Sequence, residues 1–311
     1  MPEKVCVIIP LKGVMEKFNK CIDSVMNLDY PDLEIVVVDD GIGESTLTLL
    51  DKFKGKIKVL QSNSCGPSFA RNLASRSTDA GLIAFTDSDC IVDKDWVSEL
   101  AKALEKDPQA AGCGGKQDIP DDATGFEKKV FLFMKMAGFI SDYVRKSKDT
   151  DTIEVNHNPS CNLMYKREIF LEEGGFLEGL WPGEDVELDF RLRKKGYKLL
   201  FNPRAVVYHY KPKNFKSFLK MMYRYGLAQG FLARKYGVFR RTQMIPGLNL
   251  FFLLVFLFFI SYDKALALWF VSGILILAFL YFLDFPVLVI ALGANLFWNL
   301  GFIRGWIRKP G

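Results

Sequence analysis

The first third of the chain alternates short apolar runs with stretches in which apolar residues recur at helical spacing. Four runs predict strands buried on both faces, because they are mostly apolar and end at a turn residue or an acid: residues 5–9, 33–38, 57–60 and 82–85. Helical stretches lie between them, at residues 18–27 and 67–75. Strands that alternate with helices over short links predict an α/β fold with a mostly parallel, Rossmann-like sheet.

Polar residues follow the ends of these predicted strands. Asp40 follows the second strand, and the sequence Thr-Asp-Ser-Asp at residues 86–89 follows the fourth. Ligands of such sheets bind beyond the carboxyl ends of the strands. Two carboxylates two residues apart, here Asp87 and Asp89, can share a hard divalent cation. Most Asp-x-Asp pairs simply lie in solvated loops. This pair directly follows a predicted buried strand, which favours a metal site.

A second acidic point occurs late in the charged part of the chain, where Glu184 and Asp185 follow Trp181-Pro182-Gly183. One acid at the start of a helix is the ordinary response to the helix dipole. Two acids behind a Trp-Pro-Gly sequence indicate a rigid, partly desolvated site. A carboxylate in such a site can accept a proton from a hydroxyl nucleophile.

The hydrophobic pattern changes abruptly after residue 244. Residues 245–303 contain only three charged side chains, Asp263, Lys264 and Asp284. They separate three apolar segments, 245–262, 265–283 and 286–303, each of roughly the 18–20 residues that a helix needs to cross hydrocarbon. We expect two to three transmembrane helices. Further cations after the third segment leave its orientation open.

Positive charge is concentrated just before this apolar region. The formal net charge is +5, and residues 205–241 contain nine Lys or Arg and no Asp or Glu. Residues 214–236 predict an amphipathic helix, and a basic belt beside an apolar tail favours anionic lipid headgroups. Nucleic acid, the competing partner, does not explain the tail. A second amphipathic stretch, 125–145, has three interpretations: a helix packed on the core, a helix in the plane of the membrane, or one wall of the groove that binds an acceptor substrate.

The six cysteines are scattered, with no close pair at metal-ligand or redox spacing. We expect them to be reduced and structural, which favours a cytosolic side for the charged part of the chain.

Several of these segments together resemble the motifs of family 2 glycosyltransferases. The stretches that carry the resemblance are 7–10 (VIIP), 35–41 (IVVVDDG), 66–72 (GPSFARN), 85–89 (FTDSD), 162–168 (NLMYKRE), 174–176 (GGF), 183–185 (GED), 191–192 (RL), 196–197 (GY) and 223–226 (YRYG). They follow the family's order. The resemblance implies a glycosyltransferase A fold, a nucleoside-diphosphate sugar donor, Mn²⁺ or Mg²⁺, and inversion at the anomeric carbon.

The resemblance also implies roles on the donor side. The residues implied in donor binding are Pro10, Lys12, Val38, Asp40, Arg71, Asp87, Ser88 and Arg224. Among them, Asp40 is expected to accept from the base, and Arg224 to neutralise the departing diphosphate. The implied metal ligands are Asp89, Asp87 and His209, although a lone histidine is more often structural. Members often have Thr-Tyr-Asn after the first proline; here Lys12 lies in that segment and is expected to reach a phosphate.

On the acceptor side, Asp185 resembles the catalytic base, and Glu184 and Trp181 are implied in acceptor binding. A phosphate nucleophile is already anionic and needs no base. The acid pair therefore favours a hydroxyl acceptor, such as a sugar already carried on a lipid. We expect a catalytic domain over residues 1–210 facing the cytoplasm, a membrane-interface segment over 211–244 and an integral membrane region over 245–311.

Other functions stay open at this point. A polyprenyl-phosphate sugar synthase attacks with a phosphate. A processive polysaccharide synthase usually carries Gln-x-x-Arg-Trp, but residues 221–225 lack the Gln and the Trp. An inactive, membrane-tethered nucleotide-binding module and a nucleotidyltransferase are the alternatives from other classes.

Overall fold

The computed structural model describes residues 2–12, 17–41, 50, 52–53, 55–140 and 151–308. The chain divides into two compact units. The first comprises Met1–Ala123 and Ile140–Tyr210, and the second comprises Thr124–Phe139 and Lys211–Gly311.

Within its described residues, the first unit is built on a nine-stranded sheet with the order β3-β2-β1-β4-β8-β6-β9-β5, in which β7 also pairs with β9. The strands are β1 (Val5–Leu11), β2 (Leu33–Asp39), β3 (Lys58–Gln61), β4 (Leu82–Phe85), β5 (Cys90–Val92), β6 (Ala110–Asp118), β7 (Ile153–Glu154), β8 (Leu163–Lys166) and β9 (Lys198–His209). The half formed by β1 to β4 is parallel, as the sequence pattern predicts. The other half is mixed, because β8 runs antiparallel to both β4 and β6.

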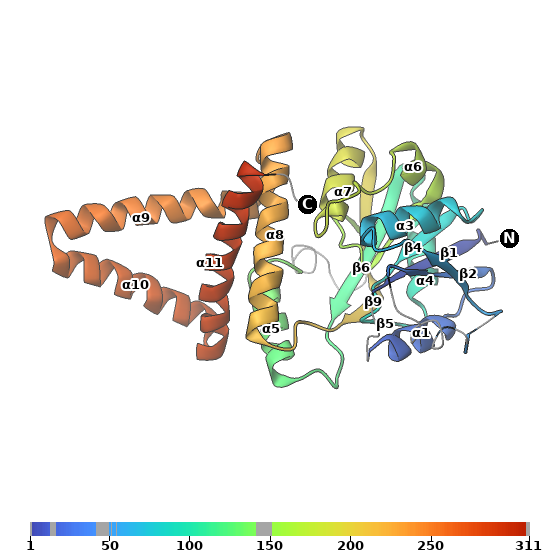
Figure 1. Cartoon of the computed structure of the whole chain (residues 1–311), viewed down its shortest axis with the longest axis horizontal. Helices are drawn as coiled ribbons and strands as arrows, with labels where there is room; N and C mark the ends of the chain where they lie inside the picture. The colour runs from blue at the N-terminus through green and yellow to red at the C-terminus, as the bar shows by residue number, and fades with distance from the viewer. Residues whose placement is uncertain are drawn as a thin grey trace. The chain divides into compact units, whose positions relative to one another are not determined.

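Helices cover both faces of this sheet (Figure 1). They are α1 (Phe18–Met26) and α4 (Trp96–Lys106) on one face, and α3 (Pro67–Arg76), α6 (Arg167–Glu172) and α7 (Glu184–Lys194) on the other. Strand β1 is buried along its whole length: Val7 and Ile9 face the first pair of helices, and Cys6 and Ile8 face the second set. This two-sided burial is the reason for the continuous apolar run.

The second unit is helical. Its elements are α5 (Gly125–Met136), α8 (Phe215–Tyr236), the 3₁₀ turn η1 (Arg241–Met244), α9 (Ile245–Tyr262), α10 (Lys264–Phe282) and α11 (Phe285–Ile307). Helices α8 and α11 run side by side (Figure 1). A Cβ atom on Gly301 of α11 would lie 2.0 Å from the carbonyl oxygen of Tyr223, and one on Gly226 of α8 would lie 2.1 Å from that of Trp298. Glycine therefore allows the two backbones to touch.

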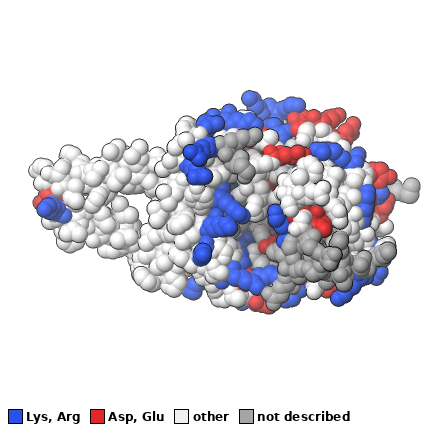
Figure 2. Space-filling view, viewed as in Figure 1, with Lys and Arg blue, Asp and Glu red and all other residues white. Residues whose placement is uncertain are grey.

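Helices α9 and α10 form a hairpin whose side chains are almost all exposed. Leu254 is 56% exposed and Leu268 is 69% exposed. In Figure 2 the hairpin shows Lys, Arg, Asp or Glu only at its tip, where the turn contains Asp263 and Lys264. Together with α11, the described part of the chain has three helices long and apolar enough to cross a membrane. The three predicted apolar segments agree with α9, α10 and α11 to within four residues.

The amphipathic stretch at 125–145 includes α5, which belongs to the second unit. Its Phe133 packs against Phe218 of α8 and Phe282 of α10, and its Lys129 pairs with Asp284 at 2.7 Å. The apolar side of this helix therefore packs on the other helices of that unit. Residues 141–150 of the stretch lie outside the described residues.

Candidate active site

The carboxylates after β4 are brought to His209 by strand pairing. Strand β5 starts at Cys90 and runs antiparallel to the end of β9, so that Cys90 pairs with His209. The Nε2 atom of His209 lies 3.4 Å from Oδ1 of Asp89. One ligand atom each from Asp87, Asp89 and His209 lie within 4.8 Å of one another. The pairing of two strands far apart in sequence thus assembles a group of three ligands.

Arg71 of α3 connects this group to the second acidic motif. Its guanidinium is 1% exposed and lies between two carboxylates, 2.6 Å from Asp87 and 2.8 Å from Glu184. A buried cation is stable only when its charge is compensated in this way. The structure therefore brings the two predicted acidic motifs together. It also shows that Arg71, predicted as a donor-binding residue, is held by carboxylates on both sides.

The start of α7 presents the acid pair. Gly183 has φ of 104°, a conformation that favours glycine, and the helix begins at Glu184. The two carboxylate oxygens of Asp185 accept from the backbone N–H groups of Ser160 (2.9 Å) and Val186 (2.7 Å). These two donors orient the Asp185 side chain, which is half-buried.

Glu184 is more deeply placed, with only 2% of its surface exposed. Burial and the neighbouring Asp185 carboxylate raise the pKa of Glu184 to about 8, against the lowering effect of Arg71. Its Oε1 accepts from Ser160 as well as Arg71, whereas Oε2 is buried with no hydrogen-bond partner in the described chain. Glu184 can therefore donate or accept one further hydrogen bond, depending on its protonation.

A buried aspartate one turn further along α7 supports this motif and was missed from the sequence. Asp189 is fully buried and accepts from the backbone N–H of Asn158 at 2.8 Å and from the hydroxyl of Tyr165 at 2.5 Å. Its second oxygen also contacts Nδ1 of His157 at 2.8 Å. Its position four residues after Asp185 and its apolar neighbours in sequence are the signal that was available.

The predicted nucleoside-binding residues lie at adjacent strand ends. Pro10 of β1 pairs in register with Val38 of β2, and both are buried. Asp40 is 1% exposed and accepts from the hydroxyl of Ser62 at 2.6 Å and the N–H of Gly66 at 3.0 Å. These two donors hold the carboxylate in place; Gly66 belongs to the motif at 66–72, whereas Ser62 was not singled out from the sequence.

Lys12 and the remaining predicted residues differ in exposure. Lys12 is 65% exposed, with Nζ 3.7 Å from Asp40. Ser88 is buried, and Trp181 is 48% exposed. Arg224 lies on α8 in the second unit. The functions of all these residues stay predictions.

Two cysteines that are far apart in sequence lie beside His209. Cys90 and Cys161 form a hydrogen bond with each other, and Cys161 forms one with His209. The hydrogen bond from Cys90, together with His209, lowers the pKa of Cys161 to about 6, against the effect of burial. Sequence spacing gave no sign of this pair, because it is the fold that brings the start of β5 to the segment before β8.

The group of Asp87, Asp89 and His209 fits a divalent cation. Two carboxylate oxygens and one imidazole nitrogen suit Mn²⁺, and the carboxylates alone suit Mg²⁺. The side chains are 20–30% exposed, which leaves room for further ligands from a substrate.

Comparison with known proteins identifies the family. The model of the family described as "Glycosyl transferase family 2" matches residues 6–174, more than half of the chain. The chain belongs to glycosyltransferase family 2. The motifs up to the glycine pair at 174–175 lie within or at the end of this match, so family 2 membership accounts for the order of the strand ends and of the acids at residues 40 and 87–89.

Curated relatives of this family 2 chain are transferases of sugars. It is 25% identical over 264 residues to the dolichyl N-acetyl-alpha-D-glucosaminyl phosphate 3-beta-D-2,3-diacetamido-2,3-dideoxy-beta-D-glucuronosyltransferase of Methanococcus voltae, covering 80% of each chain. It is 28% identical to the glucosyl-dolichyl phosphate glucuronosyltransferase of Haloferax volcanii, covering 52% of this chain and 51% of the relative.

Solved structures confirm the glycosyltransferase A fold. The mannosyltransferase PcManGT from Pyrobaculum calidifontis, in complex with GDP-Man and Mn²⁺, matches 99% of this chain and 89% of its own with a TM-score of 0.70 at 16% identity. Residues 1–349 of TarS from S. aureus, in complex with UDP-GlcNAc, match 73% of this chain and 66% of their own, with a TM-score of 0.54 at 19% identity. At these identities the likeness shows the fold alone.

Proposed function

We propose that this family 2 enzyme is an inverting, membrane-bound transferase. It moves a sugar from a nucleoside diphosphate to a hydroxyl group of a lipid-linked sugar and depends on a divalent cation. The observation that carries this proposal is the Arg71 guanidinium, which is held between Asp87 and Glu184. Arg71 thereby connects Asp87, part of a group that fits a metal-bound diphosphate, with Glu184, part of an acid pair that fits an acceptor.

On the donor side, Asp87, Asp89 and His209 are the residues that fit the cation. The cation, when bound, supplies a Lewis acid that neutralises charge on the leaving diphosphate. Asp40 is held by Ser62 and Gly66, and a carboxylate has acceptor capacity left for the N–H groups of a base. Lys12 is exposed beside it and fits a phosphate contact.

On the acceptor side, Asp185 is the proposed base. Two backbone N–H groups donate to its oxygens and orient it. The acceptor oxygen forms a bond to the anomeric carbon while the bond from that carbon to the phosphate oxygen breaks on the opposite face, as in an inverting displacement. Asp185 takes the hydroxyl proton, and Glu184 contributes its unpartnered Oε2 to binding the acceptor.

The relatives support a lipid-linked sugar as the acceptor class. The names of the M. voltae and H. volcanii relatives denote acceptors in which a sugar is already attached to dolichyl phosphate. The three apolar helices of this chain are consistent with an enzyme that meets its acceptor at a membrane. We place the catalytic unit on the cytoplasmic side as part of the same proposal.

The test uses the full chain in lipid nanodiscs, with a panel of nucleotide sugars, Mn²⁺, and either polyprenyl phosphate or a polyprenyl-phosphate sugar as the acceptor. We expect transfer only to the glycosylated lipid, with the product linkage inverted relative to the donor by NMR. Replacing Asp185 with Asn should lower kcat by at least about 100-fold, whereas Asp23→Asn, an exposed acid on α1, should leave it unchanged.

Transfer to bare polyprenyl phosphate that Asp185→Asn leaves intact would contradict the proposed acceptor and base. Ladders of products in place of single additions would indicate a processive synthase. Binding of nucleotide sugars without any turnover would indicate a tethered binding module.

A further inference from the structure

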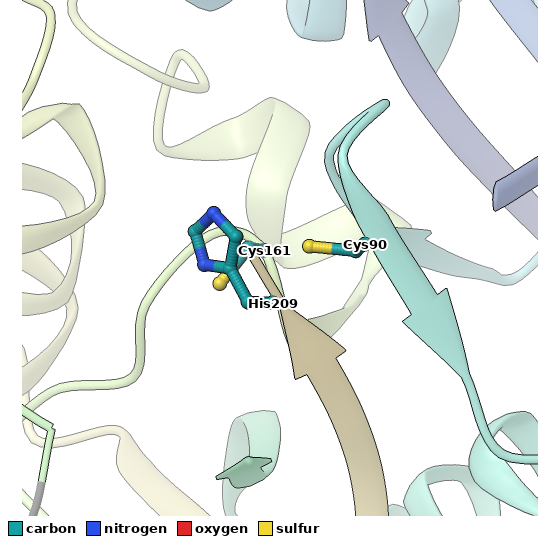
Figure 3. A group of neighbouring side chains, drawn as sticks. All are labelled: Cys90, Cys161 and His209. Carbon is teal, nitrogen blue, oxygen red and sulfur yellow. The ribbon is translucent and has the colours of Figure 1, made fainter. Parts of the chain in front are cut away.

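A second group of metal-ligating side chains adjoins the group of Asp87, Asp89 and His209, which we call the acidic group. It consists of Cys90 at the start of β5, Cys161 before β8 and His209 at the end of β9, and we call it the thiol cluster (Figure 3). One ligand atom from each residue lies within 4.8 Å of the other two. The thiols are deeply placed: Cys90 is 0% exposed and Cys161 is 4% exposed.

Three separate parts of the fold hold this cluster together. Strand pairing sets Cys90 opposite His209. Strand β8 pairs Leu163 with Phe85 of β4. Cys161, two residues before Leu163, therefore lies close to the segment that follows Phe85 and contains Asp87 and Asp89. No other cysteine of the described chain belongs to a group of three such ligands. Buried Cys6, Cys21 and Cys113 therefore serve as comparisons, since a buried cysteine alone usually acts as a small apolar residue.

The donor atoms of the cluster differ chemically from those of the acidic group. Two thiolates and an imidazole select borderline and soft cations, whereas carboxylate oxygens suit Mg²⁺ and Mn²⁺. In a tetrahedral site with bonds of about 2.0–2.3 Å, ligand atoms lie roughly 3.3–3.8 Å apart. The cluster needs to close by no more than about 1.5 Å, and Asp89 Oδ1, 3.4 Å from His209 Nε2, is within reach of the fourth position.

We propose that Cys90, Cys161 and His209 bind a thiophilic divalent cation of the Zn²⁺ and Cd²⁺ class, and that this cation competes for His209 with the cation of the acidic group. Any protonated thiol gives its proton to solvent as its sulfur bonds to the metal, and the step involves no redox change. The competition follows from the ring itself, because a neutral imidazole offers one lone pair.

The competition, but not the binding, rests on the proposed function of the acidic group. A thiophilic cation that takes His209 leaves the acidic group only its two carboxylates, and Asp89 can be drawn to the fourth position of the thiol cluster as well. The chain should then hold Mn²⁺ more weakly and turn over more slowly when the thiol cluster is occupied.

Cd²⁺ alone is the probe for binding. The full chain, in detergent, reduced and stripped of metal, is titrated with Cd²⁺ while the thiolate-to-metal charge-transfer absorption is recorded. Cadmium X-ray absorption on the wild-type chain counts the sulfur neighbours without any substitution. We expect one tightly bound Cd²⁺ with two sulfur neighbours, and a loss of affinity of at least about 10-fold in Cys161→Ser.

Two matched variants control for other thiols. Cys113→Ser removes a buried thiol outside the cluster, and Cys65→Ser removes an exposed one; both should bind Cd²⁺ as the wild type does. Thermal unfolding of each variant confirms that it is folded. Cadmium bound only through oxygen or nitrogen, or bound equally by Cys161→Ser, overturns the proposal.

The competition is measured without donor or acceptor, as free Mn²⁺ detected by electron paramagnetic resonance. One equivalent of Cd²⁺ should weaken Mn²⁺ binding at least about 10-fold in the wild type, and not in Cys161→Ser. An unchanged Mn²⁺ affinity with Cd²⁺ held at two sulfurs overturns the sharing of His209. A chain that binds both cations as expected but transfers no sugar counts against the proposed function alone.

Discussion

At the scale of single residues, the side chain that organises this site is Arg71. It is fully buried and compensated by two carboxylates that come from different elements, Asp87 after β4 and Glu184 of α7. The planar guanidinium contacts both through separate nitrogens, a geometry that a point charge on a flexible stem does not reproduce. The position of one acidic motif relative to the other therefore depends on the shape of this cation as well as its charge.

We predict that Arg71→Lys lowers both stability and activity. Above pH 8, where Glu184 is ionised, losing one of the two ionic contacts leaves this buried carboxylate uncompensated, at a cost of about 3 kcal/mol or more. Denaturant unfolding and kcat measure the two effects. The control is Arg76→Lys on the same helix, whose pair with Glu178 is about half exposed, and it should change stability by less than about 0.5 kcal/mol.

A second prediction concerns Glu184 and pH. Its pKa rises from 4.5 in the unfolded chain to about 8 in the folded one, so the folded state binds the proton more tightly. Its contribution is favourable below pH 4.5 and is lost as the pH rises towards 8. Glu184→Gln should therefore gain stability relative to wild type over this range, by several kcal/mol in all, since one pKa unit is worth about 1.4 kcal/mol. A stability difference that is constant from pH 5 to 8 would contradict the raised pKa.

At the scale of elements, the contact between α8 and α11 depends on glycines on both helices. Gly226 and Gly230 of α8 face the backbone of α11, and Gly301 and Gly305 of α11 face the backbone of α8. Each pair is spaced by four residues, so its members lie on one face of their helix. Arg234 of α8 donates to the last carbonyl groups of α11 and closes one end of this contact.

Adding a single methyl group should separate these helices. Gly301→Ala would place a Cβ atom 2.0 Å from a backbone oxygen, so the helices must move apart and the second unit should lose stability by about 1–3 kcal/mol. Gly273→Ala on α10 is the matched control, because nothing lies within 4 Å of its Cβ position. Thermal unfolding in detergent distinguishes the two, and equal behaviour would show that the contact does not constrain the unit.

At the scale of the whole molecule, the charged sheet unit and the apolar helices divide the chemistry of the chain. The hairpin of α9 and α10 exposes large apolar side chains all around, which is stable only in contact with lipid or another apolar surface. The turn at Asp263 and Lys264 is charged and therefore needs to reach water.

The location of this turn depends on whether the hairpin spans the bilayer. If α9 and α10 each cross the membrane, the turn and the first unit lie on opposite sides. With α9 as the first span, we expect Lys264→Cys to react with an impermeant maleimide on the side opposite to Cys65, which is exposed in the first unit. Labelling of sealed vesicles and of permeabilised ones measures this. Reaction of both cysteines from one side would indicate a hairpin that lies in the membrane surface.

Sequence patterns predicted the elements with the strongest local signals. The strands of the parallel half are recognised by continuous apolar runs, because they are buried on both faces. The three long apolar segments are recognised by apolar residues on every side of the helix. The glycine-rich β6 was not predicted, because it carries few of the side chains by which a strand is recognised. Likewise, α5 could not be assigned from sequence to the second unit, since an amphipathic face does not indicate which surface covers it.

For the site, sequence patterns alone singled out the residues that we predict to carry the chemistry: acids that follow buried strands, and an acid pair at the start of a helix. Which of these residues lie together depends on the tertiary fold. Antiparallel pairing of β5 with β9 brings His209 to Asp89 and to two cysteines. Arg71 reaches two acids more than ninety residues apart. The physical reason is that local patterns record burial and backbone preference, whereas contacts between distant segments depend on strand order and on how helices pack over the sheet.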